Sequence, residues 1–94
     1  MTRSDLSLTC IVLKQPKGYT ALCVDVDVAS EGATPAKAKQ MLREALEIYL
    51  DTAFENNLPY LRPVSRDQDP RYISPETVIE TFSLRVDLAV QVHA

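Results

Sequence analysis

Two runs of strand-favouring residues near the start of the chain predict a β-hairpin. Residues 6–13 (LSLTCIVL) and 19–26 (YTALCVDV) are rich in apolar and β-branched types, which favour strands. Between them, Gln-Pro-Lys-Gly at 15–18 combines a proline and a glycine in a strong turn signal. A hairpin closed by Lys14 and Tyr19 has apolar residues on both faces near its middle. We therefore expect it to lie inside a sheet, or to have one face covered by another chain.

A short third strand and the start of a helix follow the hairpin. Residues 27–33 (DVASEGA) are typical of a short strand that runs into a turn at Gly32. Thr34 is a favourable N-cap residue, and Pro35 suits the first helical position because its missing N–H has no helical partner there. The sequence thus predicts that a helix begins after this threonine.

Apolar residues recur at spacings of three and four after this start, which predicts one amphipathic helix. The apolar stripe consists of Ala38, Met41, Leu42, Ala45, Leu46, Tyr49 and Ala53. The residues expected to face away from it are Lys39, Arg43, Glu47 and Asp51. We expect the helix to end at the two asparagines 56–57, shortly before Pro59.

Residues 57–76 are expected to form a long connection, because prolines recur through them and no apolar period is sustained. Tyr60-Leu61 and Tyr72-Ile73 are the residues expected to hold this connection against the body of the domain. A connection of this length is unusual in a small domain and is often functional.

The end of the chain alternates strictly between apolar and polar residues, which predicts one strand of eleven residues over 82–92. Its apolar positions are Phe82, Leu84, Val86, Leu88, Val90 and Val92. A long strand with an apolar face at a sheet edge favours pairing with another chain. We therefore expect a homo-oligomer formed through a strand edge.

The predicted order of elements is strand, strand, strand, helix, strand (β-β-β-α-β). This order defines an α+β fold, in which one amphipathic helix packs on one face of an antiparallel sheet. With 94 residues, 46% of them apolar, the chain has room for one domain spanning 1–94 and a composition typical of globular proteins.

The charge balance argues against nucleic acid as a direct partner. Ten Lys and Arg residues are scattered among thirteen Asp and Glu residues, giving a net charge of −3. The nearest approach to a basic cluster is Lys37, Lys39 and Arg43 at the start of the helix, whereas nucleic-acid-binding proteins usually present a basic patch. The chain also contains no apolar run typical of a signal peptide or a membrane span, so we expect no membrane association and a cytoplasmic location.

Two aspartates are the strongest candidates for a metal site. Asp25 and Asp27 lie two residues apart near the end of the second predicted strand, so their side chains share a face. With Glu44 or Glu47 from the helix they would bind a divalent cation, as in a metal-dependent nuclease. The alternative is that the aspartates only mark the exposed end of the strand. Because both glutamates lie on or near the outward face of the helix, convergence is poor and we expect no metal.

Other catalytic equipment is scarce in this sequence. His93 is the only histidine and lies one residue from the end, where we expect it to be solvated. The only glycines are Gly18 and Gly32, which excludes a glycine-rich phosphate loop. We therefore expect a protein that is not an enzyme, with no catalytic residues and no cofactor.

The only two cysteines face each other in the predicted hairpin. The register that pairs Lys14 with Tyr19 places Cys10 directly opposite Cys23. Two cysteines make neither a disulfide framework nor a metal site. The expected state is a pair of small apolar thiols in a reduced core, and a functional cross-link is the alternative.

Residues 19–50 resemble the HicB family, the antitoxin half of bacterial HicA–HicB toxin–antitoxin pairs. The features that carry the resemblance are Tyr19, the Asp-Val-Ala-Ser-Glu-Gly run at 27–32, Thr34 at the helix start and the Ala-Leu-Glu-Ile-Tyr-Leu run at 45–50. The chain departs from the family pattern at 23–27, where many members carry Pro-Asp-Leu-Pro-Gly. After the helix it shows only the long connection and one strand, in place of the DNA-binding module of many members. Operator binding therefore does not carry over.

The resemblance implies the same β-β-β-α-β fold and a non-catalytic mechanism. The antitoxin would cover the active site of a small, basic, RNA-cleaving HicA-type toxin, and an acidic protein suits such a partner because complementary charge speeds encounter. Asp25, Asp27 and Glu31 are the candidate toxin-binding residues, and simple solubility is the alternative role for each. The alternative function is a solitary homo-oligomeric regulator or scaffold of the same fold, without a toxin partner.

Overall fold

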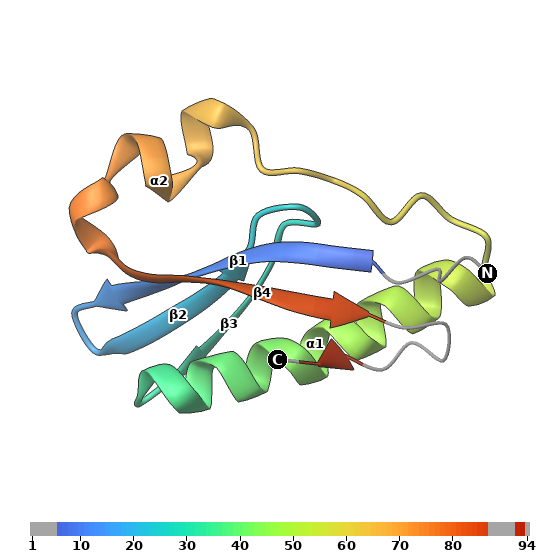
Figure 1. Ribbon diagram of the computed structural model, residues 1–94, viewed down its shortest axis with the longest axis horizontal. Helices are drawn as coiled ribbons and strands as arrows, with labels where there is room; N and C mark the ends of the chain where they lie inside the picture. The colour runs from blue at the N-terminus through green and yellow to red at the C-terminus, as the bar shows by residue number, and fades with distance from the viewer. Residues whose placement is uncertain (1–5, 87–91, 94) are drawn as a thin grey trace.

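The computed structural model describes residues 6–86 and 92–93 of the chain. Its elements, in chain order, are β1 (Leu6–Gln15), β2 (Gly18–Cys23), β3 (Val28–Gly32), α1 (Pro35–Glu55), η1 (Arg66–Gln68), α2 (Pro70–Ile73), η2 (Pro75–Thr77), β4 (Val78–Val86) and β5 (Val92–His93). The strands form one antiparallel sheet in the order β3-β2-β1-β4-β5, with α1 on one face (Figure 1). The α+β class and the β-β-β-α-β order are confirmed. None of the helices in the described ranges has the length and apolar character to cross a membrane.

The β1–β2 hairpin has the predicted register. Lys14 pairs with Tyr19, and Cys10 pairs with Cys23. The Val24 N–H donates to the Thr9 carbonyl at 3.0 Å, which marks these two residues as a hydrogen-bonded pair just beyond the last register pair. Because hydrogen-bonded and non-hydrogen-bonded pairs alternate along an antiparallel ladder, the adjacent cysteine pair is of the non-hydrogen-bonded kind.

The first strand is the centre of the sheet, between β2 and β4. Its residues Cys10, Ile11 and Val12 have no exposed surface. Cys10 belongs to the core beneath α1, whereas Ile11 belongs to a second, smaller core on the other face. The expectation that the hairpin lies inside the sheet is therefore confirmed for β1, and its continuous apolar run follows from burial on both faces.

Helix α1 begins and ends where the sequence predicts. The Thr34 hydroxyl accepts the Lys37 N–H at 3.0 Å, and Pro35 occupies the first helical position. Gly32 sits so close to the first turn that an added Cβ would lie 2.4 Å from the Ala38 nitrogen, so a larger residue has no room there. At the other end, Asn57 adopts a positive φ of 54°, which ends the helix.

The buried stripe of α1 differs in detail from the predicted one. The fully buried positions are Ala38, Leu42, Leu46, Leu50 and Ala53. Lys39 was expected to face away, and this is wrong: its Nζ donates to Glu80 Oε2 at 2.6 Å and lies 5.2 Å from the centre of the Phe82 ring. The long aliphatic stem lets this ammonium group reach β4 across the flank of the helix.

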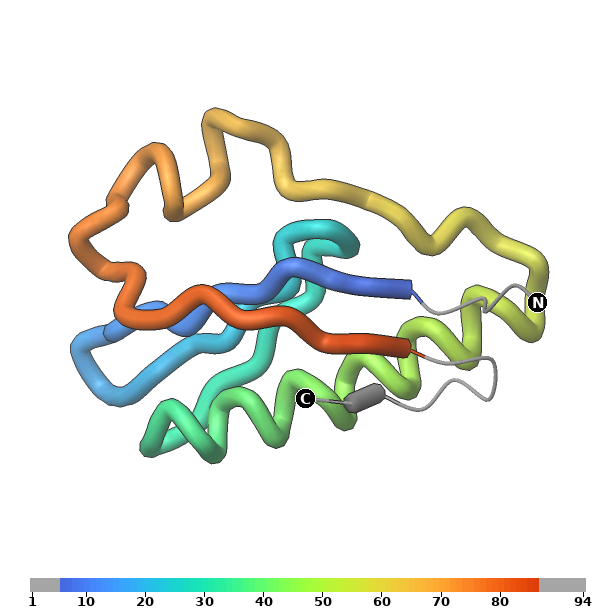
Figure 2. Tube along the Cα trace, in the orientation of Figure 1, coloured from blue at the N-terminus to red at the C-terminus, as the bar shows by residue number. Residues whose placement is uncertain are grey.

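The connection between α1 and β4 crosses the face of the sheet opposite the helix (Figure 2). Its backbone bonds to the sheet, with the Arg62 N–H donating to the Asp25 carbonyl at 2.9 Å and the Val64 N–H to the Val24 carbonyl at 2.8 Å. The small core on this face consists of Ile11, Leu13, Leu22 and Val24, against which Val64 and Val78 pack.

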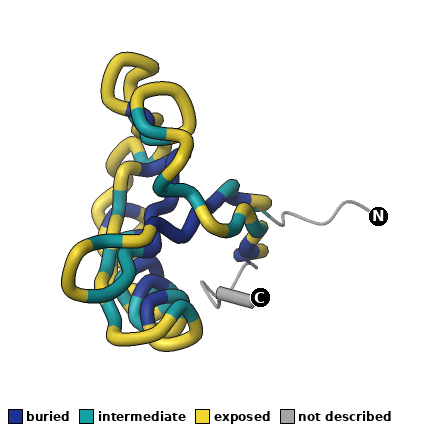
Figure 3. The backbone as a smooth tube through the Cα atoms, turned by 90° about the vertical axis from the view of Figure 1, so that its left-hand side faces the viewer, coloured by how far each residue is buried: buried dark blue, intermediate teal, exposed yellow. Residues whose placement is uncertain are grey.

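The prediction of which side chains hold the connection in place is mostly wrong. Tyr60 is half-buried and packs against the helix-side core, but Leu61, Tyr72 and Ile73 are 54%, 56% and 59% exposed. Backbone hydrogen bonds and Val64 hold this segment instead, which leaves much of it exposed (Figure 3).

The last predicted strand is shorter than expected. Leu84 and Val86 are buried on the helix side of β4 and alternate with exposed Ser83 and Arg85, as predicted. A single strand over 82–92 is wrong, because Val92 pairs antiparallel with Val86 itself. Leu88 and Val90 lie outside the described residues.

Candidate functional site

Asp25 and Asp27 do not lie side by side on a strand face. Strand β2 ends at Cys23, and residues 24–27 form the turn to β3. Asp27 is exposed and has a positive φ of 55°, a conformation that aspartate tolerates better than most residues. Its N–H donates to the Cys23 carbonyl at 2.9 Å. The expectation that the two carboxylates share a strand face is therefore wrong, because the strand ends two residues earlier.

The Asp25 side chain supplies the last hydrogen-bond acceptor at the end of the β1–β2 ladder. Its Oδ2 accepts the Thr9 N–H at 2.7 Å. That N–H would ordinarily donate to the Val24 carbonyl, but this carbonyl already accepts the Val64 N–H of the connection. The half-buried carboxylate therefore replaces a backbone acceptor where the connection joins the sheet, which is a structural role.

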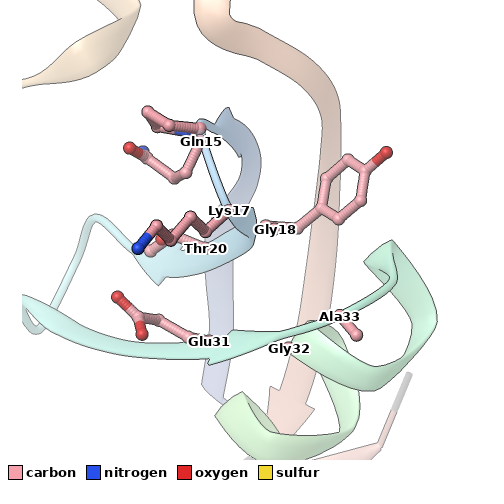
Figure 4. Close-up of a pocket in the computed structure, with 9 residues that line it drawn as sticks. Gln15, Lys17, Gly18, Thr20, Glu31, Gly32 and Ala33 are labelled. Carbon is pink, nitrogen blue, oxygen red and sulfur yellow. The ribbon is translucent and has the colours of Figure 1, made fainter.

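Glu31 lies apart from the other two candidate residues. It is exposed on β3, opposite Thr20 of β2 and four residues beyond Asp27, or about 13 Å along an extended strand. It lines an open hollow of about 850 Å³ between the β1–β2 turn and the end of β3, where Lys17 and Glu31 project to the same side (Figure 4). The structure thus places Asp25 and Asp27 in one turn and Glu31 near the opposite end of β3.

The glutamates considered as further metal ligands do not join the two aspartates. Glu44 is exposed and lies 3.5 Å from the Gln40 amide on α1, while Glu47 is half-buried on the same helix. Over residues 6–86 and 92–93, the structure contains no group of three or more His, Cys, Asp or Glu side chains suited to a metal ion. The side chain of His93 lies outside the described residues.

The outward face of α1 carries a feature that sequence reasoning missed. Ile48 is 70% exposed at the middle of this face. The exposed acidic residues Glu44, Asp51 and Glu55 lie four, three and seven residues from it, so all of them share its face. The signal was present in the sequence, since Ile48 falls outside the apolar stripe that faces the sheet.

Two more apolar side chains are exposed where this face ends. Phe54 is 42% exposed and packs edge-on against the Tyr60 ring, with ring centroids 5.0 Å apart. Leu58, 54% exposed, follows directly after the helix, and its N–H donates to the Ala53 carbonyl at 2.8 Å. We call the surface formed by Glu44, Ile48, Asp51, Phe54, Glu55 and Leu58 the acidic end.

The charges of α1 are arranged against its dipole. The first turn holds no acidic residue and the last turn no basic one. Lys37 and Lys39 lie near the N-terminus, whereas Asp51 and Glu55 lie near the C-terminus, where the partial negative charge of the helix disfavours them by about 0.3–1 kcal/mol each. Because α1 runs most of the length of the molecule, this arrangement separates a basic end from an acidic one (Figure 1).

An ion pair between a buried aspartate and an exposed arginine caps α2 within the connection. Asp69 is only 2% exposed, and its Oδ2 accepts the Arg71 Nη2 donor at 2.7 Å. Its Oδ1 also accepts the Arg71 N–H at 2.9 Å, which caps α2. The hydrogen bonds from the Arg71 side chain lower the pKa of the Asp69 carboxyl, although burial acts in the opposite direction. Nothing in the sequence marked this aspartate as buried.

The two cysteines are free thiols in the core beneath α1, as expected. The Cys23 sulfur, followed by burial, raises the pKa of the Cys10 thiol. A raised pKa keeps this thiol protonated and poorly nucleophilic near neutral pH. The pKa of the Cys23 thiol is lowered by its contact with Cys10, but both side chains are fully buried, so neither thiol is accessible as a nucleophile in the folded state.

We also compared the chain with other proteins. No protein-family model, curated protein sequence or solved structure matches it.

Proposed function

We propose that this chain is a non-catalytic protein-binding domain, a HicB-like antitoxin that neutralises a small, basic, RNA-cleaving toxin of the HicA type by covering its active site. The resemblance over residues 19–50 and the β-β-β-α-β fold support this proposal. The observation that carries it is the acidic end of α1, where exposed apolar and acidic side chains share one surface.

The composition of the acidic end suits a basic protein partner. An enzyme that cleaves RNA carries positive charge where it binds phosphates, and an acidic surface speeds its encounter and favours the matching orientation. Ile48 supplies an exposed apolar side chain, and Glu44, Asp51 and Glu55 lie beside it on the same face of α1. An apolar centre with a polar rim is the usual anatomy of a protein–protein interface.

The three residues named from the sequence have different roles in this proposal. Asp27 is exposed in the β2–β3 turn, and Glu31 is exposed on β3 beside the start of α1, away from the acidic end. In this proposal they act through the net negative charge that attracts a basic partner and not through contact at the acidic end. Asp25 acts mainly through the fold, because its carboxylate holds the Thr9 amide. A substitution of Asp25 would therefore weaken binding by destabilising the domain.

The direct test is binding to a purified HicA-type toxin, measured by calorimetry and by rescue of growth on co-expression. Ile48→Ala should raise Kd about tenfold or more, since a central apolar anchor is lost. The double substitution Asp51→Lys with Glu55→Lys should weaken binding most at low salt, where charge is least screened. Lys37→Glu, at the opposite end of the same helix, is the matched control and should leave Kd within about threefold. No binding of the wild type, or equal binding of all variants, would overturn the proposal.

The edge of β3 favours the solitary homo-oligomer as a second candidate function. The backbone N–H and C=O of Leu22 bond to β1, so Leu22 and its β3 partner Ala29 form a non-hydrogen-bonded pair. The backbone N–H and C=O of Ala29 therefore point away from β2, and the same holds for Glu31 opposite Thr20. Among the described residues β3 is an end strand of the sheet, so these groups are available to a second copy.

Light scattering during size-exclusion chromatography tests this second candidate. Ala29→Pro removes one outward N–H without touching the bonds to β2, because proline is tolerated on an edge strand. Ala29→Gly is the matched control, since it keeps the N–H. A dimer lost only in the proline variant would support pairing through β3, and a wild-type monomer would exclude it.

A further inference from the structure

The thiols of Cys10 and Cys23 are placed for a reaction that the proposed function does not use. They lie on adjacent strands, directly opposite each other, and both belong to the core beneath α1. Both residues are fully buried, and both thiols are free. No charged or catalytic role accounts for two cysteines meeting at one point of this core.

The geometry of the ladder brings the two cysteines within bonding reach. The Val24 N–H to Thr9 carbonyl bond marks the next pair along as hydrogen-bonded, so the cysteines occupy a non-hydrogen-bonded position. At such positions the two Cα atoms are about 4.5 Å apart, and the side chains approach more closely than at the alternate positions. Disulfides span Cα separations of about 4.4–6.8 Å. The separation typical of such a pair lies at the short end of this range, so a bond between these sulfurs does not require the strands to move apart.

We propose that Cys10 and Cys23 are an oxidative modification site, at which hydrogen peroxide converts the two thiols into an intramolecular cross-strand disulfide. One thiolate attacks the peroxide and becomes a sulfenic acid, and the peroxide leaves as hydroxide, which the released thiol proton converts to water. The second sulfur then displaces hydroxide from the sulfenic acid, and its proton leaves in a second water molecule. The two sulfurs together lose two electrons, and the two peroxide oxygens gain them.

Burial determines when this reaction takes place. Neither thiol has exposed surface, so peroxide reaches them only during openings that separate α1 from the sheet or part the two strands. Oxidation is consequently slow in the folded protein and faster under mild destabilisation. Once formed, the disulfide joins β1 to β2 and is itself shielded from reductants by α1. The oxidised domain therefore unfolds less readily than the reduced one.

The experiment uses the full reduced chain treated with hydrogen peroxide, then denatured, alkylated and digested with trypsin. Cleavage after Lys14 and Lys17 separates the cysteines onto peptides 4–14 and 18–37. The expected product is one chain about 2 Da lighter, not alkylated, whose two cysteine peptides run as a single linked species until reduced. Its thermal midpoint should rise by roughly 10 °C and return after denaturation and reduction.

Cys10→Ala and Cys23→Ala are the matched controls, because each removes one sulfur and keeps a small apolar side chain. Circular dichroism confirms that each folds, and neither should gain thermal stability on treatment. The proposal fails if peroxide gives only separate sulfinic or sulfonic acids, or only dimers linked between chains. It also fails if both thiols can still be alkylated after peroxide treatment in urea just below the unfolding midpoint, where the domain opens more often. The readouts involve no toxin, so their outcome is independent of the proposed function.

Discussion

The Asp25 carboxylate accepts the Thr9 N–H at 2.7 Å and thereby takes the place of a backbone carbonyl in the β1–β2 ladder. The displaced acceptor, the Val24 carbonyl, bonds instead to Val64 of the connection. The Asp25 side chain thus leaves the Val24 carbonyl free to bond to the segment that covers the second face of the sheet. Substitutions at Asp25 should reveal this role.

Asp25→Ala should lower the free energy of unfolding by about 1–3 kcal/mol, because it leaves a partly buried N–H without its charged acceptor. Urea denaturation measures the change. Asp27→Asn is the control, since it removes a neighbouring charge but keeps a residue that tolerates the positive φ at this position. It should change the stability by less than about 0.5 kcal/mol. Equal losses in the two variants would argue against the structural role of Asp25.

Gly32 limits how closely β3 and α1 approach. A Cβ at this position would lie 2.4 Å from the Ala38 nitrogen and 2.8 Å from the Lys37 carbonyl carbon, and backbone atoms cannot move aside cheaply. Gly32→Ala should therefore cost about 1–3 kcal/mol of stability. Ala33→Ser, which adds one atom at the exposed neighbouring position, should cost less than about 0.5 kcal/mol. A Gly32→Ala domain as stable as wild type in urea would show that this junction adjusts freely.

The hairpin and the helix were predictable because local signals specify them. Pro16 and Gly18 fix a two-residue turn, and the turn then sets every pair of the β1–β2 register, including Cys10 with Cys23. Thr34 and Pro35 fix the start of the helix in the same way. Each of these signals acts within a few residues of the structure that it determines.

The connection and the end of the chain were not predictable by the same means. The connection is held by backbone bonds between residues far apart in sequence, such as Val64 to Val24, which no local pattern encodes. At the C-terminal end, Val92 pairs back onto Val86, although strict alternation continues through 82–92 and is equally compatible with one strand or two.

The candidate site was predictable only in part. The charge of acidic residues predicts that they lie on the surface, but whether a carboxylate is hydrogen-bonded within the fold depends on its neighbours. The Asp25 carboxylate accepts a hydrogen bond from the Thr9 amide, which comes from a different part of the chain. Ile48 could have been found from the sequence, because an isoleucine on the polar side of an amphipathic helix is exposed.

The Asp69–Arg71 pair should make stability depend on pH. The pKa of the Asp69 carboxyl is lowered in the folded state. The pair therefore stabilises the fold fully above the ordinary Asp pKa of 3.8, and this stabilisation is lost as pH falls through the lower pKa of the folded state. Arg71→Gln should cost about 1 kcal/mol at pH 7, a modest value because the arginine side chain is 37% exposed. In urea unfolding at decreasing pH, the difference from wild type should shrink below about pH 4. A difference that stays constant down to pH 2.5 would show that Arg71 contributes through packing and not through its charge.

The charge polarity of α1 connects stability with the proposed function. Glu55 ends the helix, where a cation is preferred, so Glu55→Lys should raise the free energy of unfolding by about 0.5–1 kcal/mol. Lys37→Glu should do the same at the other end, where it also completes a capping box with Thr34. Thermal denaturation of the free domain measures both gains.

If the acidic end binds a basic partner, only Glu55→Lys should weaken that binding, because Lys37 lies at the opposite end of the same helix. Two variants that are equally stabilised but differ in affinity would show that the charges opposing the dipole serve recognition. Equal affinities would instead mean that the polarity of the helix has no bearing on the partner, and the toxin-binding surface would have to be sought around Asp27 and Glu31.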